Sequence, residues 1–362
     1  MAVRIDDLLA KAAERPQALT HPELMRVITT PDAPALFAAA YAVKERVVGR
    51  RVSLRGIVEF GNACEKDCYY CGIRRGNAAV RRYRMTADEV VAGALSARDN
   101  GYGNVVLQSG ELAGEANTAF VEDVLRRIRS AAGGEFGITL SLGEQTEETY
   151  RRWRAAGAHR YLLRIETSVP SLYARLHPAD HSWEKRRDCL RALRRCGYQV
   201  GTGAMSALPG QTPDDLASDI EFFAAEDVDM IGMGPYIPHP DTPLGANETL
   251  TEEDKARWLD VALRMIAATR LYLHDVNIAA ATALQALADD GRERGLLAGA
   301  NVLMPNLSPV GVRDKYLLYD NKICTGEESA QCKDCLSRRV ASVGYQIVTS
   351  RGDSLRVQRG GQ

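Results

Sequence analysis

The chain has 362 residues, 45% hydrophobic and 26% charged, which are globular proportions and exclude a disordered or fibrous protein. Its 46 basic and 47 acidic residues leave a net charge of −1, so no overall field favours nucleic acid or an anionic membrane. The first residues include acidic side chains where a signal peptide needs an apolar run, and no stretch of about 18 apolar residues occurs. We therefore expect a soluble, cytoplasmic protein.

Two or three helices are expected in the first 50 residues, where Thr20 and Glu23 have the spacing of a capping box. From residue 51 onward, apolar strand-like runs alternate with helical patterns. The expected strands are 51–60, 104–110, 136–143, 160–167, 199–207, 229–236, 274–282 and 300–306. The expected helices between them are 85–101, 117–131, 146–157, 182–197, 212–227, 251–270 and 285–299.

Eight strands separated by helices of this length require parallel pairing through right-handed crossovers. Eight such units close a (β/α)8 TIM barrel, which we place at residues 51–306. Residues 1–50 then form an N-terminal helical extension, and 307–362 a C-terminal segment that contains cysteines. A doubly wound open sheet is the alternative, but such a sheet rarely uses eight regular repeats.

Six of the eight cysteines fall into two groups, which in an intracellular chain suggests metal binding and not disulfides. Cys64, Cys68 and Cys71 follow the first strand with C-x3-C-x2-C spacing. Three thiolates on one loop can hold three corners of a [4Fe-4S] cluster and leave the fourth iron open for catalysis. The alternative is a zinc knuckle, which usually needs a second cysteine pair nearby. Cys189 and Cys196 share one face of a predicted helix and are interpreted as structural thiols.

Polar residues follow several other strands, where a barrel places its functional groups. The second strand ends in Gln108, Ser109, Gly110 and Glu111, and the third offers Thr139, Ser141 and Glu144. Arg160, Arg164 and Glu166 share a face of the fourth strand if side chains alternate along it. These three form either a structural ion network or a site in which Glu166 holds a cofactor and the arginines hold an anionic substrate. His239 and Asp241, in a proline-rich loop, are either catalytic or structural.

The first cysteine group, with Tyr70 before its third cysteine, resembles the radical S-adenosylmethionine (SAM) superfamily. The resemblance implies that the open iron binds SAM, and that electron transfer to SAM releases a 5′-deoxyadenosyl radical. It also implies SAM contacts for Tyr70 and Glu166, and for the segment Gln108, Ser109, Gly110 and Glu111, which looks like the family's glycine-rich segment.

The chain is more closely similar to the FeFe-hydrogenase maturases of the HydE family, within the biotin synthase-like branch. The similar segments are CEKDCYYCGIRRGN, LQSGE, YLLRIET with Leu176-His177-Pro178, ALPGQTPDDL, MIGMGPYIPHPDTPLG, ANVLMPN and KIC-x7-CKDC. The resemblance implies processing of a small iron complex with CO, cyanide and cysteine, supplied by a partner maturase. It implies a reductant such as ferredoxin or flavodoxin, and a substrate cavity lined by Thr139, Arg160, Arg164, Thr282, Met304 and Tyr316.

The second cysteine group, Cys324, Cys332 and Cys335, follows the last barrel strand with C-x7-C-x2-C spacing. Three thiols again indicate an iron–sulfur cluster, of [2Fe-2S] or [4Fe-4S] type. Zinc, or reduced thiols without metal, are the alternatives. The resemblance adds that this distal cluster occurs in some family members and not in others, so its presence would not establish a catalytic role.

Two further classes of function remain open at this point. One is a related radical SAM enzyme: a methylornithine synthase, or a biotin synthase with sulfur chemistry. Biotin synthase needs a second cluster inside the barrel, whereas Cys189 and Cys196 lie on a predicted helix. The other class is a non-enzymatic iron–sulfur scaffold, against which the polar strand ends suited to SAM argue.

Overall fold

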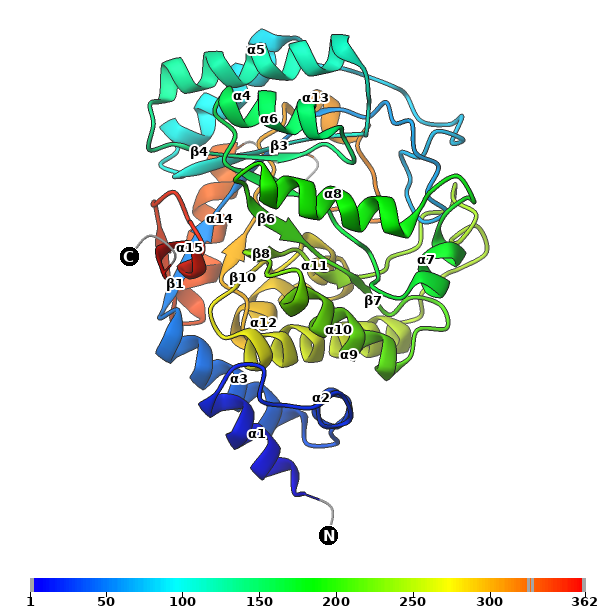
Figure 1. The fold of residues 1–362 in the computed structure, drawn as a ribbon, viewed down its shortest axis with the longest axis vertical. Coiled ribbons are helices and arrows are strands. Elements are labelled where there is room, and N and C mark those ends of the chain that lie inside the picture. The colour runs from blue at the N-terminus through cyan, green and yellow to red at the C-terminus, as the bar shows by residue number, and fades with distance from the viewer. Residues whose placement is uncertain (1–2, 324–325, 327–328, 360–362) are drawn as a thin grey trace.

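The structure is a computed structural model that describes residues 3–323, 326 and 329–359. Its centre is a ring of parallel strands (Figure 1). One sheet has the order β10-β8-β6-β5-β4-β3-β2, and a second has the order β11-β1-β12. The strands of the ring are β1 (Arg51–Leu54), β2 (Gly56–Gly61), β3 (Asn104–Ser109), β4 (Gly137–Ser141), β5 (Arg160–Leu162), β6 (Gln199–Thr202), β8 (Met230–Ile231), β10 (Asn277–Ile278) and β11 (Val302–Leu303).

Two parallel bridges join the sheets and close the ring. Ile57 of β2 pairs with Asn306, and Ala279 after β10 pairs with Val302 of β11. The backbone continues this closure, because Ser53 and Arg55 donate to the carbonyl oxygens of Asn301 and Leu303. The expected (β/α)8 barrel is therefore confirmed, with no open edge between its first and last units.

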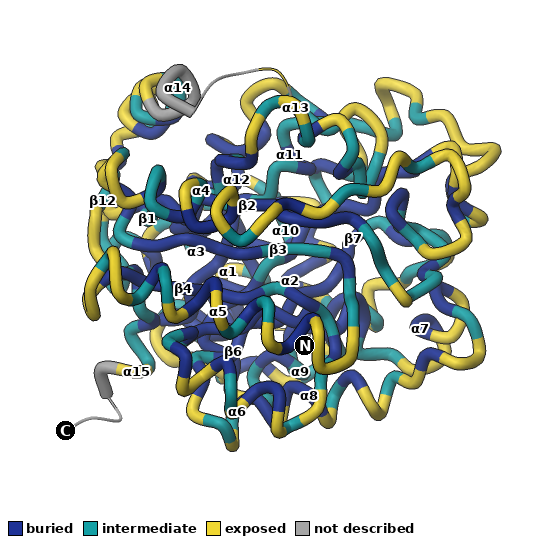
Figure 2. The backbone as a smooth tube through the Cα atoms, turned by 90° about the horizontal axis from the view of Figure 1, so that it is seen from above, coloured by how far each residue is buried: buried dark blue, intermediate teal, exposed yellow. Residues whose placement is uncertain are grey.

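Helices cover the outside of the ring, and the buried strands lie inside them (Figure 2). Several begin with the expected caps: Thr86 accepts a hydrogen bond from the Glu89 backbone, and Thr20 forms a capping box with Glu23. The covering helices are α4 (Ala87–Asp99), α5 (Glu115–Ala132), α6 (Glu147–Ala155), α7 (Pro170–Leu176), α8 (Trp183–Arg195), α9 (Pro213–Ala225), α10 (Glu252–Leu273), α11 (Thr282–Leu287), α12 (Gly291–Ala298) and α13 (Val310–Arg313).

The two ends of the chain pack on the barrel. Helices α1 (Ile5–Glu14), α2 (His21–Ile28) and α3 (Ala33–Val47) precede it and pack on α9, α10 and α12. At the other end, α14 (Ser329–Ser342) leads to β12 (Gln346–Val348), which pairs with β1. The next residues, up to α15 (Leu355–Arg359), cross the N-terminal mouth of the barrel, where Gly352 O accepts hydrogen bonds from Arg55 and Asn277 at 2.9 and 3.2 Å. We call residues 349–354 the C-terminal strap.

The strands differ from the sequence expectation in length. The run 51–60 forms two strands that break at Arg55, whose side chain turns into the barrel. The runs 199–207 and 229–236 likewise give a second pair of short strands, β7 (Met205–Ser206) and β9 (Gly234–Pro235), beyond β6 and β8. The run 160–167 keeps strand geometry only to Leu162, so the expected alternation of Arg160, Arg164 and Glu166 on one face is wrong.

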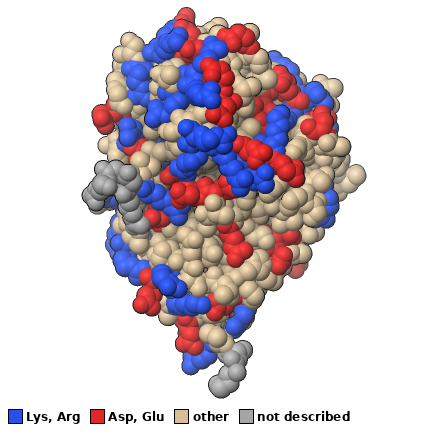
Figure 3. Space-filling model, in the orientation of Figure 1, with Lys and Arg blue, Asp and Glu red and all other residues tan. Residues whose placement is uncertain are grey.

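Acidic and basic side chains are mixed over the face seen in Figure 3, as expected for a chain with almost no net charge. Within the described ranges, none of the helices combines the length and apolar character needed to cross a membrane.

Candidate active site

The first cysteine group lies on the loop that follows β2, at the carboxyl end of the barrel. Backbone hydrogen bonds fix this loop to three other segments: Glu65 donates to Glu111 O at 2.8 Å, Tyr69 to Leu176 O at 2.9 Å and Gly72 to Leu318 O at 2.9 Å. The loop is therefore held by the ends of β3 and α7 and by the segment after α13. Such a fixed loop suits a site whose ligands must keep one geometry.

Burial governs the chemistry of the three thiols. Burial raises the pKa of Cys68 to about 12 and raises that of Cys71 well above its ordinary value. It also raises the pKa of Cys64. The thiols therefore stay protonated without metal, and metal binding must release their protons. The Glu111 backbone N–H lies 3.3 Å from Cys64 Sγ and supplies a hydrogen bond to that sulfur.

The backbone beside Cys64 leaves no room for a side chain. A Cβ placed on Gly110 would lie 2.2 Å from Ala63 O and 2.9 Å from Cys64 Cβ, so the end of β3 and the cysteine loop are in direct contact. In the described part of the chain, no three His, Cys, Asp or Glu side chains are grouped closely enough for a single metal ion. The set of three separated thiols fits a cluster, in which each thiolate binds a different iron, better than one zinc ion.

The residues expected at the end of β3 lie beside this loop. Gln108 Nε2 donates to Tyr316 OH at 3.3 Å, and Ser109 Oγ donates to Gly110 O at 2.7 Å. The Glu111 carboxylate accepts a hydrogen bond from the Glu144 backbone N–H at 2.8 Å. The structure thus brings Tyr316, predicted from a distant segment, into contact with this strand end.

Lys66 and Arg186, which the sequence analysis missed, form a buried ion network with Glu111 and Glu144 beside the cysteine loop. Lys66 Nζ donates to Glu144 at 3.0 Å and lies 3.4 Å from Glu111, and Arg186 Nε donates to the other oxygen of Glu144 at 3.0 Å. Burial opposes ionisation of Glu144, but Arg186 and Lys66 outweigh it and lower the pKa of that carboxyl. Lys66 lies within the cysteine motif and could have been noticed, whereas Arg186 is one of many charged residues of α8.

Glu166 has a strained backbone beyond the end of β5. Its φ is 68°, in the left-handed region that favours glycine, and two hydrogen bonds impose this geometry: Glu166 N–H to Gly203 O and Met205 N–H to Glu166 O. Its carboxylate is 2.9 Å from Arg164 Nη2, but this buried oxygen has no aligned hydrogen-bond donor among the described residues. Glu166 can therefore accept a hydrogen bond from a ligand above the barrel.

Arg160 lies at the opposite end of the barrel interior. Its Nε donates to Thr139 Oγ1 at 3.0 Å, and its Nη1 donates to Asp353 Oδ1 of the C-terminal strap at 3.1 Å. Arg55, also missed, is fully buried beside it and reaches from the break between β1 and β2 to Met230 on β8. Burial, and then the charge of Arg55, holds the pKa of Arg160 well below its ordinary value, while burial lowers that of Arg55 to about 10.

The remaining predicted cavity residues lie at the carboxyl rim. Thr282 begins α11 and Met304 follows β11, and both side chains are partly exposed. Tyr316 is buried next to a pair that the sequence analysis missed, in which Lys322 Nζ is 2.6 Å from Glu59 Oε1. The structure therefore separates the predicted residues into a rim set and a set at the base of the barrel, which includes Thr139 and Arg160.

Tyr70 and the loop residues His239 and Asp241 have close local partners. The Tyr70 ring is perpendicular to that of His177, with centroids 5.4 Å apart, and its hydroxyl is 3.4 Å from His177 Nε2. His239 Nδ1 accepts a hydrogen bond from the Asp241 backbone N–H at 3.1 Å. This bond lies within the proline-rich loop, and the Leu244 N–H joins that loop to the cysteine loop by donating to Tyr69 O at 3.0 Å.

Of the second cysteine group, Cys324 and the side chain of Cys332 lie outside the described residues. Cys335 is on α14 and partly exposed. Cys189, in contrast, is buried on α8, where its thiol donates to Gln145 O at 3.8 Å, which fits the structural role expected for it.

A barrel with three cysteines on its first loop and polar groups at the neighbouring strand ends defines the radical SAM class of enzymes. In agreement, residues 58–223 match the family model described as the radical SAM superfamily. The chain is 44% identical over 324 residues to the [FeFe] hydrogenase maturase subunit HydE of Thermotoga maritima, covering 89% of each protein. The chain therefore belongs to the HydE family of radical SAM enzymes, whose resident cofactors are a [4Fe-4S] cluster and SAM.

More distant relatives share the fold. The biotin synthase of Corynebacterium glutamicum is 26% identical over 310 residues, covering 84% of this chain and 89% of its own. The crystal structure of methylornithine synthase superposes with a TM-score of 0.78 at 24% identity, covering 94% of this chain and 97% of that one. This structural likeness confirms the barrel and does not distinguish between substrates.

Proposed function

We propose that this enzyme processes a small anionic iron complex with CO, cyanide and cysteine ligands during assembly of the diiron subcluster of FeFe-hydrogenase. In this proposal Cys64, Cys68 and Cys71 hold the [4Fe-4S] cluster. Tyr70, Glu166 and the segment Gln108, Ser109, Gly110 and Glu111 contact SAM. With the cluster reduced by one electron and SAM bound to it, these two cofactors would supply a 5′-deoxyadenosyl radical for the reaction at substrate sulfur.

The excess positive charge inside the barrel is the observation that supports this substrate. Arg55 and Arg160 are both buried there, and Asp353, which bonds Arg160, also pairs with Arg351 of the same strap. The Nε of Arg55 and the Nη2 of Arg160 have no hydrogen-bond partner among the described residues. Because an unpaired buried donor and an uncompensated charge are both costly, this interior favours an anion with several acceptor atoms.

The remaining site residues, the second cysteine group and the partners also have roles in this proposal. Arg164, Thr282, Met304 and Tyr316 would contact substrate near the rim, and Thr139 would orient Arg160 from the neighbouring strand β4. A second iron–sulfur cluster, bound by Cys324, Cys332 and Cys335, is part of the proposal. So are the other hydrogenase maturases as partners, a protein reductant of the ferredoxin or flavodoxin type, and a cytoplasmic location.

Anaerobic maturation of apo-hydrogenase tests the proposal, with the partner maturases present and this protein as the only variable. We expect hydrogen evolution that depends on this protein, together with 5′-deoxyadenosine formation. No hydrogen evolution from a sample that still cleaves SAM would contradict the proposed substrate. An amino acid, as in methylornithine synthase, would then become the substrate class to test.

A further inference from the structure

The segment around the cysteine loop is strongly basic although the chain as a whole is neutral. Residues 68–87 contain five arginines and no aspartate or glutamate, and Cys68 and Cys71 lie within them. Residues 60–85 form the light-blue loop at the edge of the molecule in Figure 1, between β2 and α4. A local excess of one charge in a balanced chain indicates a surface that attracts a partner of opposite charge.

Some of these arginines have structural roles, and others do not. Arg74 pairs with a carboxylate, Arg82 donates to five backbone carbonyls, and Arg84 stacks on an aromatic ring. Arg75 and Arg81 are exposed, and their side chains form no hydrogen bond or ion pair with the described residues. By contrast, exposed arginines of α6 and α8, such as Arg151 and Arg195, are paired with glutamates. Positive charge is therefore left uncompensated at Arg75 and Arg81.

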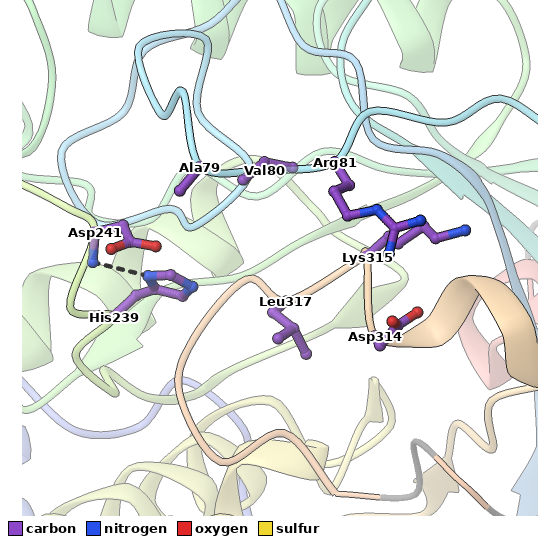
Figure 4. A pocket seen from close by; sticks show the side chains of 8 residues that line it. All are labelled: Ala79, Val80, Arg81, His239, Asp241, Asp314, Lys315 and Leu317. Atoms are coloured by element: carbon purple, nitrogen blue, oxygen red, sulfur yellow. Dashed lines mark hydrogen bonds between the residues drawn. The ribbon is translucent and has the colours of Figure 1, made fainter.

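Arg81 lines a surface pocket of about 170 Å³ between three segments (Figure 4). The segment after the cysteine loop supplies one wall, the proline-rich loop another, and the stretch after α13 the third. Lys315 adds to Arg81 a second cation that has no partner among the described residues, and Asp241 and Asp314 add two carboxylates. The lining residues are Ala79, Val80, Arg81, His239, Asp241, Asp314, Lys315 and Leu317.

Two of the residues that line this pocket pack against the backbone next to a cluster ligand. A Cβ on Gly72 would lie 2.2 Å from Leu317 O and 2.5 Å from the His239 ring, so both lining residues pack against Gly72. Gly72 follows Cys71 directly in the sequence. The lining residues His239 and Leu317 are thus separated from the Cys71 ligand by Gly72, and a group seated in the pocket would have a short path for electron transfer to the cluster.

We propose that the face formed by Arg81 and Lys315 at this pocket, together with exposed Arg75 on the same loop, docks an acidic one-electron carrier protein. We call this the carrier face. This inference rests on the proposed function, because that function needs one electron for each SAM cleaved. The carrier, a flavin or iron–sulfur protein, is oxidised by one electron and the oxidised cluster is reduced by one. The small apolar centre at Ala79, Val80 and Leu317 with charged residues around it fits a transient protein interface.

The test compares charge reversal on this face with the same reversal elsewhere. The variant is Arg75→Glu with Arg81→Glu, and the matched control is Arg15→Glu with Arg26→Glu on the N-terminal helices at the far end of the molecule (Figure 1). The rate of 5′-deoxyadenosine formation is measured with reduced flavodoxin below saturation, and separately with dithionite. At low ionic strength we expect about a tenfold or larger loss with flavodoxin in the variant only, and no loss with dithionite.

Direct binding of flavodoxin to each cluster-loaded protein gives a readout independent of turnover. We expect the affinity to fall in the carrier-face variant and in Lys315→Glu, which changes a different segment, and the difference to shrink at high salt. Equal flavodoxin rates in variant and control would overturn the proposal. So would an equal loss with dithionite, which would assign these side chains to support of the cluster loop. Failure of the unmodified protein to mature hydrogenase would count against the proposed function and leave the flavodoxin measurements valid.

Discussion

Gly110 lies where the end of β3 is in direct contact with the cysteine loop. A methyl group there would meet the Ala63 carbonyl oxygen and the Cys64 side chain, and neither can move without moving the loop. Backbone approach this close is a common reason for glycine beside a bound cofactor. Gly110 therefore affects the cluster through the position of Cys64.

Gly110→Ala should lower both the cluster iron content and the rate of SAM cleavage, the latter by about tenfold or more, because overpacking costs about 1–3 kcal/mol. Gly134→Ala is the matched control, since a Cβ at Gly134 meets no atom within 4 Å. Iron analysis and 5′-deoxyadenosine formation check both variants. Full cluster content and activity in Gly110→Ala would show that the loop can shift without harm.

Cys68→Ala should abolish SAM cleavage, because two remaining thiolates cannot hold the cluster. Cys189→Ala removes a thiol of similar burial on α8 and should keep most of the activity. The measurement is 5′-deoxyadenosine formation with dithionite after anaerobic reconstitution. Retention of full cleavage in the Cys68 variant would remove the central assignment of the site.

At the scale of elements, the sequence predicts the presence of the strands and helices better than it predicts their boundaries. Eight strand–helix repeats are recognisable because each buried strand is a short apolar run bounded by helical patterns. The break within 51–60 is not recognisable, because it depends on Arg55 turning into the barrel. The polar C-terminal strap is missed for a related reason: its contacts with Arg55, Arg160 and Gln199 exist only once the barrel has formed.

The candidate site also contains some features that local sequence predicts and others that depend on the closed barrel. The cysteine loop and the end of β3 are local motifs, so spacing and residue type suffice to predict them. The ion network of Lys66, Glu144 and Arg186 joins three loops and helices distant in sequence, and only the closed barrel brings its members together. Arg160 was predicted as a cavity residue, but its partner Asp353 is 193 residues away.

Burial of His159 should make the fold sensitive to acid, and it outweighs Asp353 of the strap, which acts in the opposite direction on the pKa of this residue. Its Nδ1 accepts a hydrogen bond from the Ile138 N–H, and its Nε2 is 3.4 Å from Asp353 Oδ1, while burial lowers its pKa from 6.5 to about 4. A lowered folded-state pKa gives stability that is present above pH 6.5 and lost as the pH falls toward 4. Between pH 7 and pH 5 the free energy of unfolding should fall by about 2 kcal/mol from this residue.

Denaturant unfolding of the protein and of His159→Gln at the two pH values measures this contribution. The glutamine keeps an acceptor for Ile138, so the variant should lose less stability on acidification than the unmodified protein. His21→Gln is the control, because hydrogen bonds to Glu221 and Asp214 raise the pKa of His21 and give it the opposite pH dependence. An identical acid loss in His159→Gln and the unmodified protein would contradict the assignment.

At the scale of the whole molecule, Cys335, the member of the second cysteine group whose side chain the structure describes, lies far from the first group. Figure 1 places α14, which includes Cys335, on the opposite side of the barrel from the light-blue cysteine loop. The carrier face lies next to the first group, so electrons from a carrier can reach the proposed catalytic cluster without passing through the second. The division into a helical extension, a barrel and a C-terminal segment remains a prediction, although β12 already joins the last part to the barrel sheet.

Cys332→Ala should therefore leave hydrogenase maturation largely intact, within about twofold of the unmodified protein, although it removes one of the three ligands of the proposed distal cluster. Maturation of apo-hydrogenase and the iron content per chain are measured together, so that loss of the distal cluster is seen directly. The proximal cluster is followed through SAM cleavage with dithionite, which should not change. A total loss of maturation with SAM cleavage intact would contradict this expectation. It would show that the distal site takes part after radical formation, in handling the substrate or product and not in supplying electrons.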